Sequence, residues 1–101
     1  MSNVVNFGSG SYSHELWIHG GQLFVNPTGV DVESVNAGAF ALEVVDANGD
    51  IKAHNVTQNE HGGWTSWDLP SLGVHNGSYK IKFVNAAAGT RQIKQGTVRT
   101  D

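Results

Sequence analysis

The chain has 101 residues, no cysteine and a net charge of −3, and only 15% of its residues are charged. This length suits one domain with one modest core, and the lack of cysteine excludes disulfides, thiolate zinc sites and cysteine nucleophiles. No apolar run reaches the roughly 18 residues of a membrane span, so we expect no membrane insertion.

The charge is distributed unevenly along the chain. Residues 1–76 carry eight carboxylates and one lysine, a net of −7, whereas residues 77–101 carry five basic residues and one carboxylate, a net of +4. Abundant glycine, asparagine, serine and threonine with few charges are typical of extracellular or surface β-proteins. We therefore expect an extracellular or cell-surface location, with no signal peptide in this chain.

Apolar residues at every second position, in short segments between turn residues, predict an all-β chain. We expect residues 1–101 to form a single antiparallel β-sandwich, immunoglobulin-like, with about seven to eight strands. The segments that show the pattern, some of which can merge, are 3–7, 12–19, 22–26, 30–35, 39–46, 50–57, 64–69, 78–85 and 90–99.

The first segment, NVVNF, is apolar and is followed by GSGS. Its residues Val4, Val5 and Phe7 could form a strand that adds to the sheet of a neighbouring molecule. The alternative is a first strand that pairs within its own domain.

The next segment, HELWIH, places His14 and His19 five positions apart. This spacing misses the HExxH zinc motif by one residue, and in a strand the two rings face opposite sides. We therefore expect no metal and no other cofactor. Trp17 and His19 alternate with Leu16 and Ile18, so they indicate an aromatic and polar face.

The clearest turn lies in FALEVVDANGDIKAHNV, where Phe40, Leu42 and Val44 share one face and DANGD predicts a hairpin turn. A helix over 37–47 is the competing interpretation, but the Val44-Val45 pair favours strands. DANGD also resembles the start of a calcium loop, but it lacks the glycine and glutamate that an EF-hand requires at positions six and twelve.

Two tryptophans stand close together in GGWTSWDLP. If 64–69 is a strand, Trp64 and Trp67 face opposite sides, because they are an odd number of positions apart. Trp67 then faces the core with Leu69, and Trp64 lies on the polar side with Asp68. An exposed indole beside a carboxylate suits stacking on a sugar, but Trp64 could instead cover the sheet edge or pack under its own loop.

The segment GSYKIKFVNAAAGTRQIKQGTV predicts a second hairpin, with Tyr79, Ile81 and Phe83 inward and a bulge at Gly96. The stretch WDLPSLGVHNGSYKIKFVN within this region resembles the penultimate-strand region of bacterial immunoglobulin-like and fibronectin-type-III-like surface domains. The resemblance implies a tyrosine-corner-like position for Tyr79, with its hydroxyl on the preceding loop. Domains of this kind include adhesins, carbohydrate-binding modules, filament subunits and spacers, so the resemblance informs fold more than function.

Enzymatic motifs are missing from the sequence: it has no GxSxG elbow and no glycine-rich phosphate loop. We therefore expect no enzyme, and no nucleic-acid partner, because aromatic residues are not interleaved with the C-terminal lysines.

The leading hypothesis is a surface module, lectin-like, whose partner is a glycan. The candidate ligand-binding residues are Trp64, Asp68, His61, Asn59, Trp17 and His19. The alternative is a self-assembling subunit of a surface filament or layer, a homo-oligomer that docks by strand addition and by acidic and basic complementarity. Its candidate residues are Val4, Val5, Phe7, Lys80, Lys82, Arg91 and Lys94.

Overall fold

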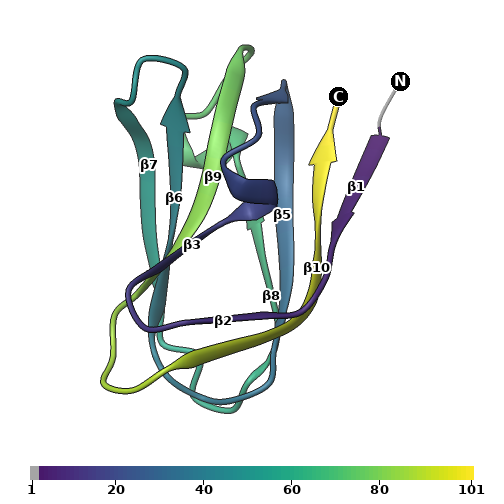
Figure 1. The fold of residues 1–101 in the computed structure, drawn as a ribbon. Helices are drawn as coiled ribbons and strands as arrows, with labels where there is room; N and C mark the ends of the chain where they lie inside the picture. The colour runs from purple at the N-terminus through teal and green to yellow at the C-terminus, as the bar shows by residue number, and fades with distance from the viewer. Residues whose placement is uncertain (1–2) are drawn as a thin grey trace.

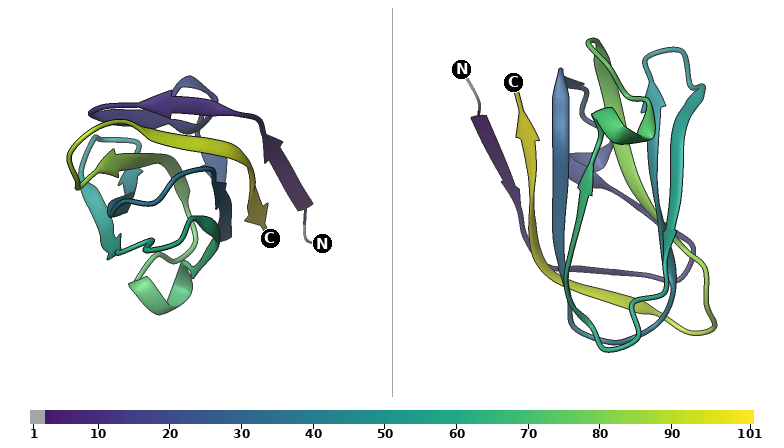
Figure 2. Two further views of the ribbon diagram at one scale, coloured as in Figure 1. Left: turned by 90° about the horizontal axis from the view of Figure 1, so that it is seen from below. Right: turned by 180° about the vertical axis from the view of Figure 1, so that it is seen from behind.

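Ten β-strands and two short 3₁₀ helices make up the computed structural model, which describes residues 3–101 (Figure 1). The bounds, in chain order, are β1 Asn3–Phe7, β2 Gly10–Tyr12, β3 Glu15–Trp17, η1 Ile18–Gly20, β4 Phe24–Val25, β5 Pro27–Ser34, β6 Phe40–Asp46, β7 Ile51–Thr57, β8 Gly63–Asp68, η2 Pro70–Leu72, β9 Ser78–Asn85 and β10 Arg91–Thr100. The strands form two antiparallel sheets that pack face to face (Figure 2). The expected all-β sandwich is confirmed.

The strands that lie next to each other in the sheets are mostly distant in the sequence. Sheet A has the order β1-β10-β5-β8, with β2 also paired to β10, and sheet B has the order β3-β9-β6-β7, with β4 also paired to β9. The chain therefore changes sheet at most of its connections. This is the strand order of a jelly roll, a double-sheet fold built from two Greek keys.

The immunoglobulin-like detail is not confirmed, and the expected hairpin between 78–85 and 90–99 is wrong. Both segments are strands, but β9 pairs within sheet B and β10 pairs within sheet A. Local alternation predicts that a segment is extended, whereas its partners depend on strands far away in the sequence. Tyr79 does lie over the preceding loop, since a Cβ on Gly77 would be 3.3 Å from its hydroxyl oxygen.

The expected strand 12–19 is divided between the two sheets. Tyr12 ends β2 in sheet A, and Glu15 begins β3 in sheet B. Asn85 holds the corner between them, because its backbone N–H donates to the His14 carbonyl at 2.8 Å and its side-chain amide donates to the Ser13 carbonyl at 2.9 Å.

Inward-facing side chains of both sheets form one core. Three aromatic rings, those of Phe40, Trp67 and Phe83, lie at its centre with centroids 5.8 to 6.1 Å apart. Tilted and edge-to-face ring pairs at this spacing stabilise the fold by more than the burial of their apolar area alone. Each fully buried side chain of this size contributes about 1.5–3 kcal/mol relative to an exposed one.

The hairpin between β6 and β7 is confirmed, so the helical alternative over 37–47 is wrong. A carboxylate oxygen of Asp46 accepts the backbone N–H groups of Asn48 and Asp50, each at 2.9 Å. These hydrogen bonds, with that of Asp50 the strongest influence, lower the pKa of the Asp46 carboxyl. Gly49 supplies the positive φ of 91° that the turn requires.

The bulge expected at Gly96 is displaced, because the register of β10 against β5 shifts between Ile93 and Gln95. Gly96 instead pairs with Phe7, whose ring lies directly across it and would overlap any Cβ there. Among residues 3–101, no helix is long and apolar enough to cross a membrane.

Candidate functional site

Strand β8 sends its two tryptophans to opposite faces of sheet A, as their odd spacing predicts. Trp67 is 6% exposed and its indole N–H donates to the Asn55 side-chain carbonyl at 3.0 Å. Trp64 is 56% exposed. Of these two tryptophans, Trp64 is therefore the one available to a ligand.

Cross-strand pairing surrounds Trp64 with polar side chains from two other strands. Trp64 is opposite Glu33 of β5, and Glu33 is opposite Gln95 of β10. A second row, from Ser66 through Asp31 to Thr97, and a third, from Asp68 through Gly29 to Arg99, run parallel to the first. We call this outer surface of sheet A the Trp64 face, and its side chains are Trp64, Ser66, Asp68, Asp31, Glu33, Gln95, Thr97 and Arg99.

The row beside the indole is held in place by a hydrogen bond. The Gln95 amide N–H donates to a Glu33 carboxylate oxygen at 2.9 Å. A carboxylate has about four acceptor positions, and the amide also has a free carbonyl and a second N–H. This pair therefore presents both donors and acceptors next to an exposed aromatic ring.

Asp31 is the centre of the second row. Its carboxylate accepts the Thr97 hydroxyl at 2.8 Å and two N–H groups of Arg99 at 3.0 and 3.3 Å. Partial burial on its own would raise the pKa of Asp31, but hydrogen bonds from Ser66 and Thr97 and the charge of Arg99 outweigh it and lower the pKa. The carboxylate is thus held ionised on this face.

The predicted ligand residues other than Trp64 are spread over several places. Asp68 points outward on the same face of β8, opposite Gly29. His61 is exposed in the loop between β7 and β8. Asn59, in the same loop, donates its amide to the carbonyls of Asn36 and Gly38 at 3.1 and 3.2 Å, so its side chain holds the loop together.

Trp17 and His19 lie at the edge of sheet B and not on the Trp64 face, so the two tryptophans do not belong to one binding surface. The Lys82 ammonium lies 4.8 Å from the centre of the Trp17 ring, and a His19 ring nitrogen lies 2.9 Å from the Asn6 carbonyl oxygen. Both side chains line a cleft of about 180 Å³ beside Phe7. Ligand pockets usually measure about 300–1,000 Å³, so this cleft is small.

The predicted assembly residues also separate. Val4, Val5 and Phe7 lie on β1, which pairs with β10 of its own chain. Lys80 and Lys82 lie in sheet B, whereas Arg91 and Lys94 lie on β10 of sheet A. Arg91 is only 7% exposed and donates to the carbonyls of Ala37 and Ala88. These basic residues therefore do not form one surface.

Among residues 3–101, no group of three or more histidine, cysteine, aspartate or glutamate side chains could hold a metal ion.

Asp31, Glu33, Gln95 and Thr97 are residues of the site that sequence reasoning missed. The alternation in VDVES shows that Asp31 and Glu33 share a face, which is a usable signal. That this face adjoins Trp64 follows only from the pairing of β5 with β8.

No protein-family model matches the chain, and a search of curated proteins found no match. Solved structures resemble it in fold. The SPBc2 prophage-derived protein YomS aligns over 99% of this chain and 96% of its own, with a TM-score of 0.58 and 16% identity. FlgD from Xanthomonas campestris, a flagellar hook-capping protein, aligns over 86% of this chain and 70% of its own, with a TM-score of 0.56 and 18% identity. At these identities the likeness shows the fold alone.

Proposed function

We propose that the protein is a non-enzymatic carbohydrate-binding module of the cell exterior that holds a glycan on the Trp64 face. The observation that carries the proposal is an indole, 56% exposed, flanked by fixed hydrogen-bonding groups on the outer surface of a sheet. An aromatic side chain can bury about 150–250 Å² against a partner. A sugar ring supplies a matching apolar C–H surface, with hydroxyls at its rim.

The polar groups of the face suit those hydroxyls. The Glu33 carboxylate accepts strong charge-assisted hydrogen bonds, and the Gln95 amide both donates and accepts. The hydrogen bond between them limits their motion, which reduces the entropy lost when a ligand binds. The parallel rows on β8, β5 and β10 extend the polar surface beyond one sugar ring, which favours an oligosaccharide.

The contacts of the carboxylates support binding without catalysis. Asp31 is engaged by Thr97 and Arg99, and these contacts lower its pKa, which is unsuitable for a general acid. Glu33 is engaged by Gln95. We therefore assign both carboxylates to recognition.

The test is a glycan array followed by titration of the best oligosaccharide, monitored by tryptophan fluorescence. Trp64→Ala should weaken binding about 30-fold or more, which corresponds to the loss of about 2 kcal/mol typical of an aromatic hot spot. Gln95→Ala should weaken it about fivefold, as expected for one net hydrogen bond. Trp17→Phe, in sheet B, is the matched control and should bind as the wild type does. A failure to bind any glycan, or unchanged binding by a folded Trp64→Ala variant, would refute the proposal.

The alternative proposal is a subunit of a surface filament or layer. The feature that favours it is β1, an edge strand of sheet A that exposes Val4 and has one side available for pairing. Electron microscopy of the purified protein would show polymers under this alternative and small discrete particles under the glycan-binding proposal.

A further inference from the structure

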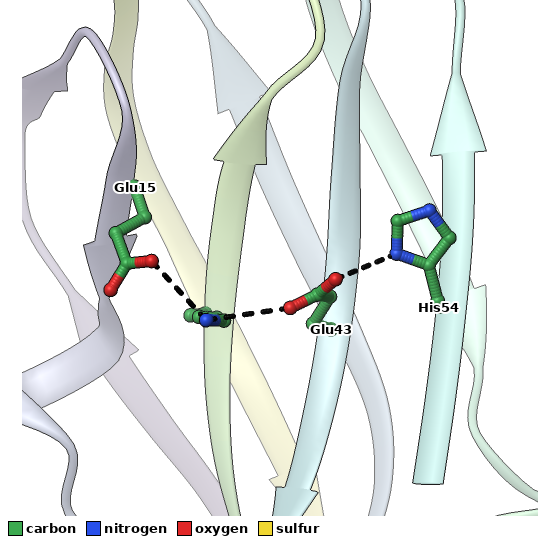
Figure 3. Close-up of polar contacts among 4 residues, drawn as sticks. Glu15, Glu43 and His54 are labelled. Atoms are coloured by element: carbon green, nitrogen blue, oxygen red, sulfur yellow. Dashed lines mark hydrogen bonds and ion pairs between the residues drawn. The ribbon is translucent and has the colours of Figure 1, made fainter. Parts of the chain in front are cut away.

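The outer surface of sheet B carries a row of alternating charges that crosses all four of its main strands (Figure 3). The Lys82 ammonium of β9 lies 3.2 Å from a Glu15 carboxylate oxygen of β3 and 3.4 Å from a Glu43 oxygen of β6. The other Glu43 oxygen lies 2.8 Å from a ring nitrogen of His54 on β7. We call Glu15, Lys82, Glu43 and His54 the charged row.

Apolar side chains on the same sheet remain exposed. Val56 of β7 is two positions from His54 and is 47% exposed, and Ile51, opposite Val45, is 57% exposed. Val25 of β4 is 62% exposed. Ala41 and Val45 of β6 also face outward, next to Glu43, between the exposed side chains. Ala41 and Val45 are themselves buried, so the exposed apolar area of this surface comes from the other three side chains.

The centre of the charged row is complementary to its own reverse, because Lys82 and Glu43 lie opposite each other on β9 and β6. Trp17 of β3 and His54 of β7 complete this row of the sheet. Glu15 reaches Lys82 from the next row, where it lies opposite Val84. A two-fold axis that runs along the strands between β9 and β6 brings a second sheet B face to face with the first and reverses the row. Lys82 then faces Glu43 of the partner subunit twice, and His54 faces Trp17 of the partner subunit. A two-fold axis across the strands would instead place Lys82 against Lys82 of the partner subunit.

We propose that the outer face of sheet B is a homodimer interface, occupied by a second copy of this chain related by the axis along the strands. The next row places Val84 of β9 against Ala41 of the partner subunit. At the rim of the interface it places Glu15 against Val56 of the partner subunit. Seven residues on each of β6, β7 and β9 and the three residues of β3, at about 4.8 Å by 3.4 Å each, give a footprint of roughly 400 Å² per copy. This is the size of a weak, transient interface, so the dimer should dissociate on dilution. The proposal does not depend on glycan binding, which uses the opposite sheet.

Sedimentation velocity from about 1 to 500 µM tests the proposal. The mass should rise with concentration from 10.8 kDa to twice that value. Val56→Glu places a carboxylate opposite Glu15 of the partner subunit and should raise the dissociation constant at least about tenfold. Val4→Glu, at an exposed valine on the outer face of sheet A, is the matched control and should dimerise as the wild type does.

A charge exchange tests the predicted axis and separates it from misfolding. Lys82→Glu alone places glutamates opposite each other, and Glu43→Lys alone places lysines opposite each other, so each variant should be monomeric. A mixture of the two variants restores an opposite charge at both inner positions and should form a heterodimer. A monomeric wild type at 500 µM, or loss of the dimer in Val4→Glu and not in Val56→Glu, would overturn the proposal. Homodimers of both variants with no heterodimer would overturn it as well.

Discussion

Asp31 is the single residue whose contacts organise the most side chains on the Trp64 face. It joins Thr97 and Arg99 of β10 to β5, and Arg99 can reach it because Gly29 leaves space for the guanidinium to cross the strand. Ion pairs at exposed positions contribute little to folding stability. Here, however, the Thr97 hydroxyl and two N–H groups of Arg99 donate to one partly buried carboxylate. The stability of this face should therefore depend on the ionisation of Asp31.

We expect acid to weaken the fold partly through Asp31. Its pKa is lower in the folded protein than its ordinary value, so the ionised carboxylate stabilises the fold above about pH 4. That stability is lost as the pH falls through the lowered pKa. Asp31→Asn should be less stable than the wild type at pH 7 and should lose less stability between pH 7 and 2.

Urea unfolding at several pH values measures this difference. Asp68→Asn is the control, because Asp68 is exposed on the same face and makes no ion pair among residues 3–101. Parallel pH profiles of the wild type and Asp31→Asn would contradict the expectation.

Among the elements, the loops at the lower end of Figure 1 are stabilised by side chains that form hydrogen bonds with backbone groups. The Asn36 amide donates to the Thr90 carbonyl at 2.7 Å, and the Asn36 side-chain oxygen accepts the Gln92 N–H at 2.9 Å. Arg91 begins β10 opposite Tyr12 and extends into the loops. Burial raises the pKa of Tyr12, and the nearby charge of Arg91 acts in the opposite direction.

Replacement of Arg91 should therefore destabilise the fold. Arg91→Met keeps an apolar stem but removes the donors to the Ala37 and Ala88 carbonyls. Hydrogen bonds to a charged group contribute about 1.5–3 kcal/mol, a loss that chemical denaturation can measure. Lys94→Met, an exposed change on the same strand, should stay within about 0.5 kcal/mol of the wild type. Equal stability of the two variants would show that Arg91 is not structural.

At the scale of the whole molecule, the sandwich separates two surfaces with different chemistry. Sheet A presents the Trp64 face, and sheet B presents the charged row with exposed aliphatic side chains. Stacking two copies through sheet B would direct the two Trp64 faces in opposite directions. Stacked sheets are about 10 Å apart, so the outer faces of four stacked sheets would lie roughly 30 Å from each other.

If both proposals hold, the dimer should link two glycan-bearing surfaces. Two binding sites that face away from each other cannot engage one flat surface, but they can join two particles. The wild type should therefore agglutinate beads coated with the glycan. The Val56→Glu variant should bind the soluble glycan with unchanged affinity and should not agglutinate the beads. Agglutination by a monomeric Val56→Glu variant would contradict this arrangement.

The sequence by itself determined the properties that depend on near neighbours along the chain. Alternation predicted the all-β sandwich, the DANGD turn predicted the hairpin of β6 and β7, and the spacing of Trp64 and Trp67 predicted their opposite faces. Each of these follows from the two-residue period of a strand or from the conformation of a turn. No knowledge of distant partners is needed for them.

The tertiary structure alone decided which strands are neighbours. Pairing between segments tens of residues apart is selected by burial of a common core, and it separated β9 from β10, placed Glu33 and Gln95 beside Trp64 and buried Arg91. The charged row arises in the same way, because its four side chains come from four strands. Local patterns show whether a side chain faces outward, but only the register between distant strands brings outward-facing side chains together into a surface.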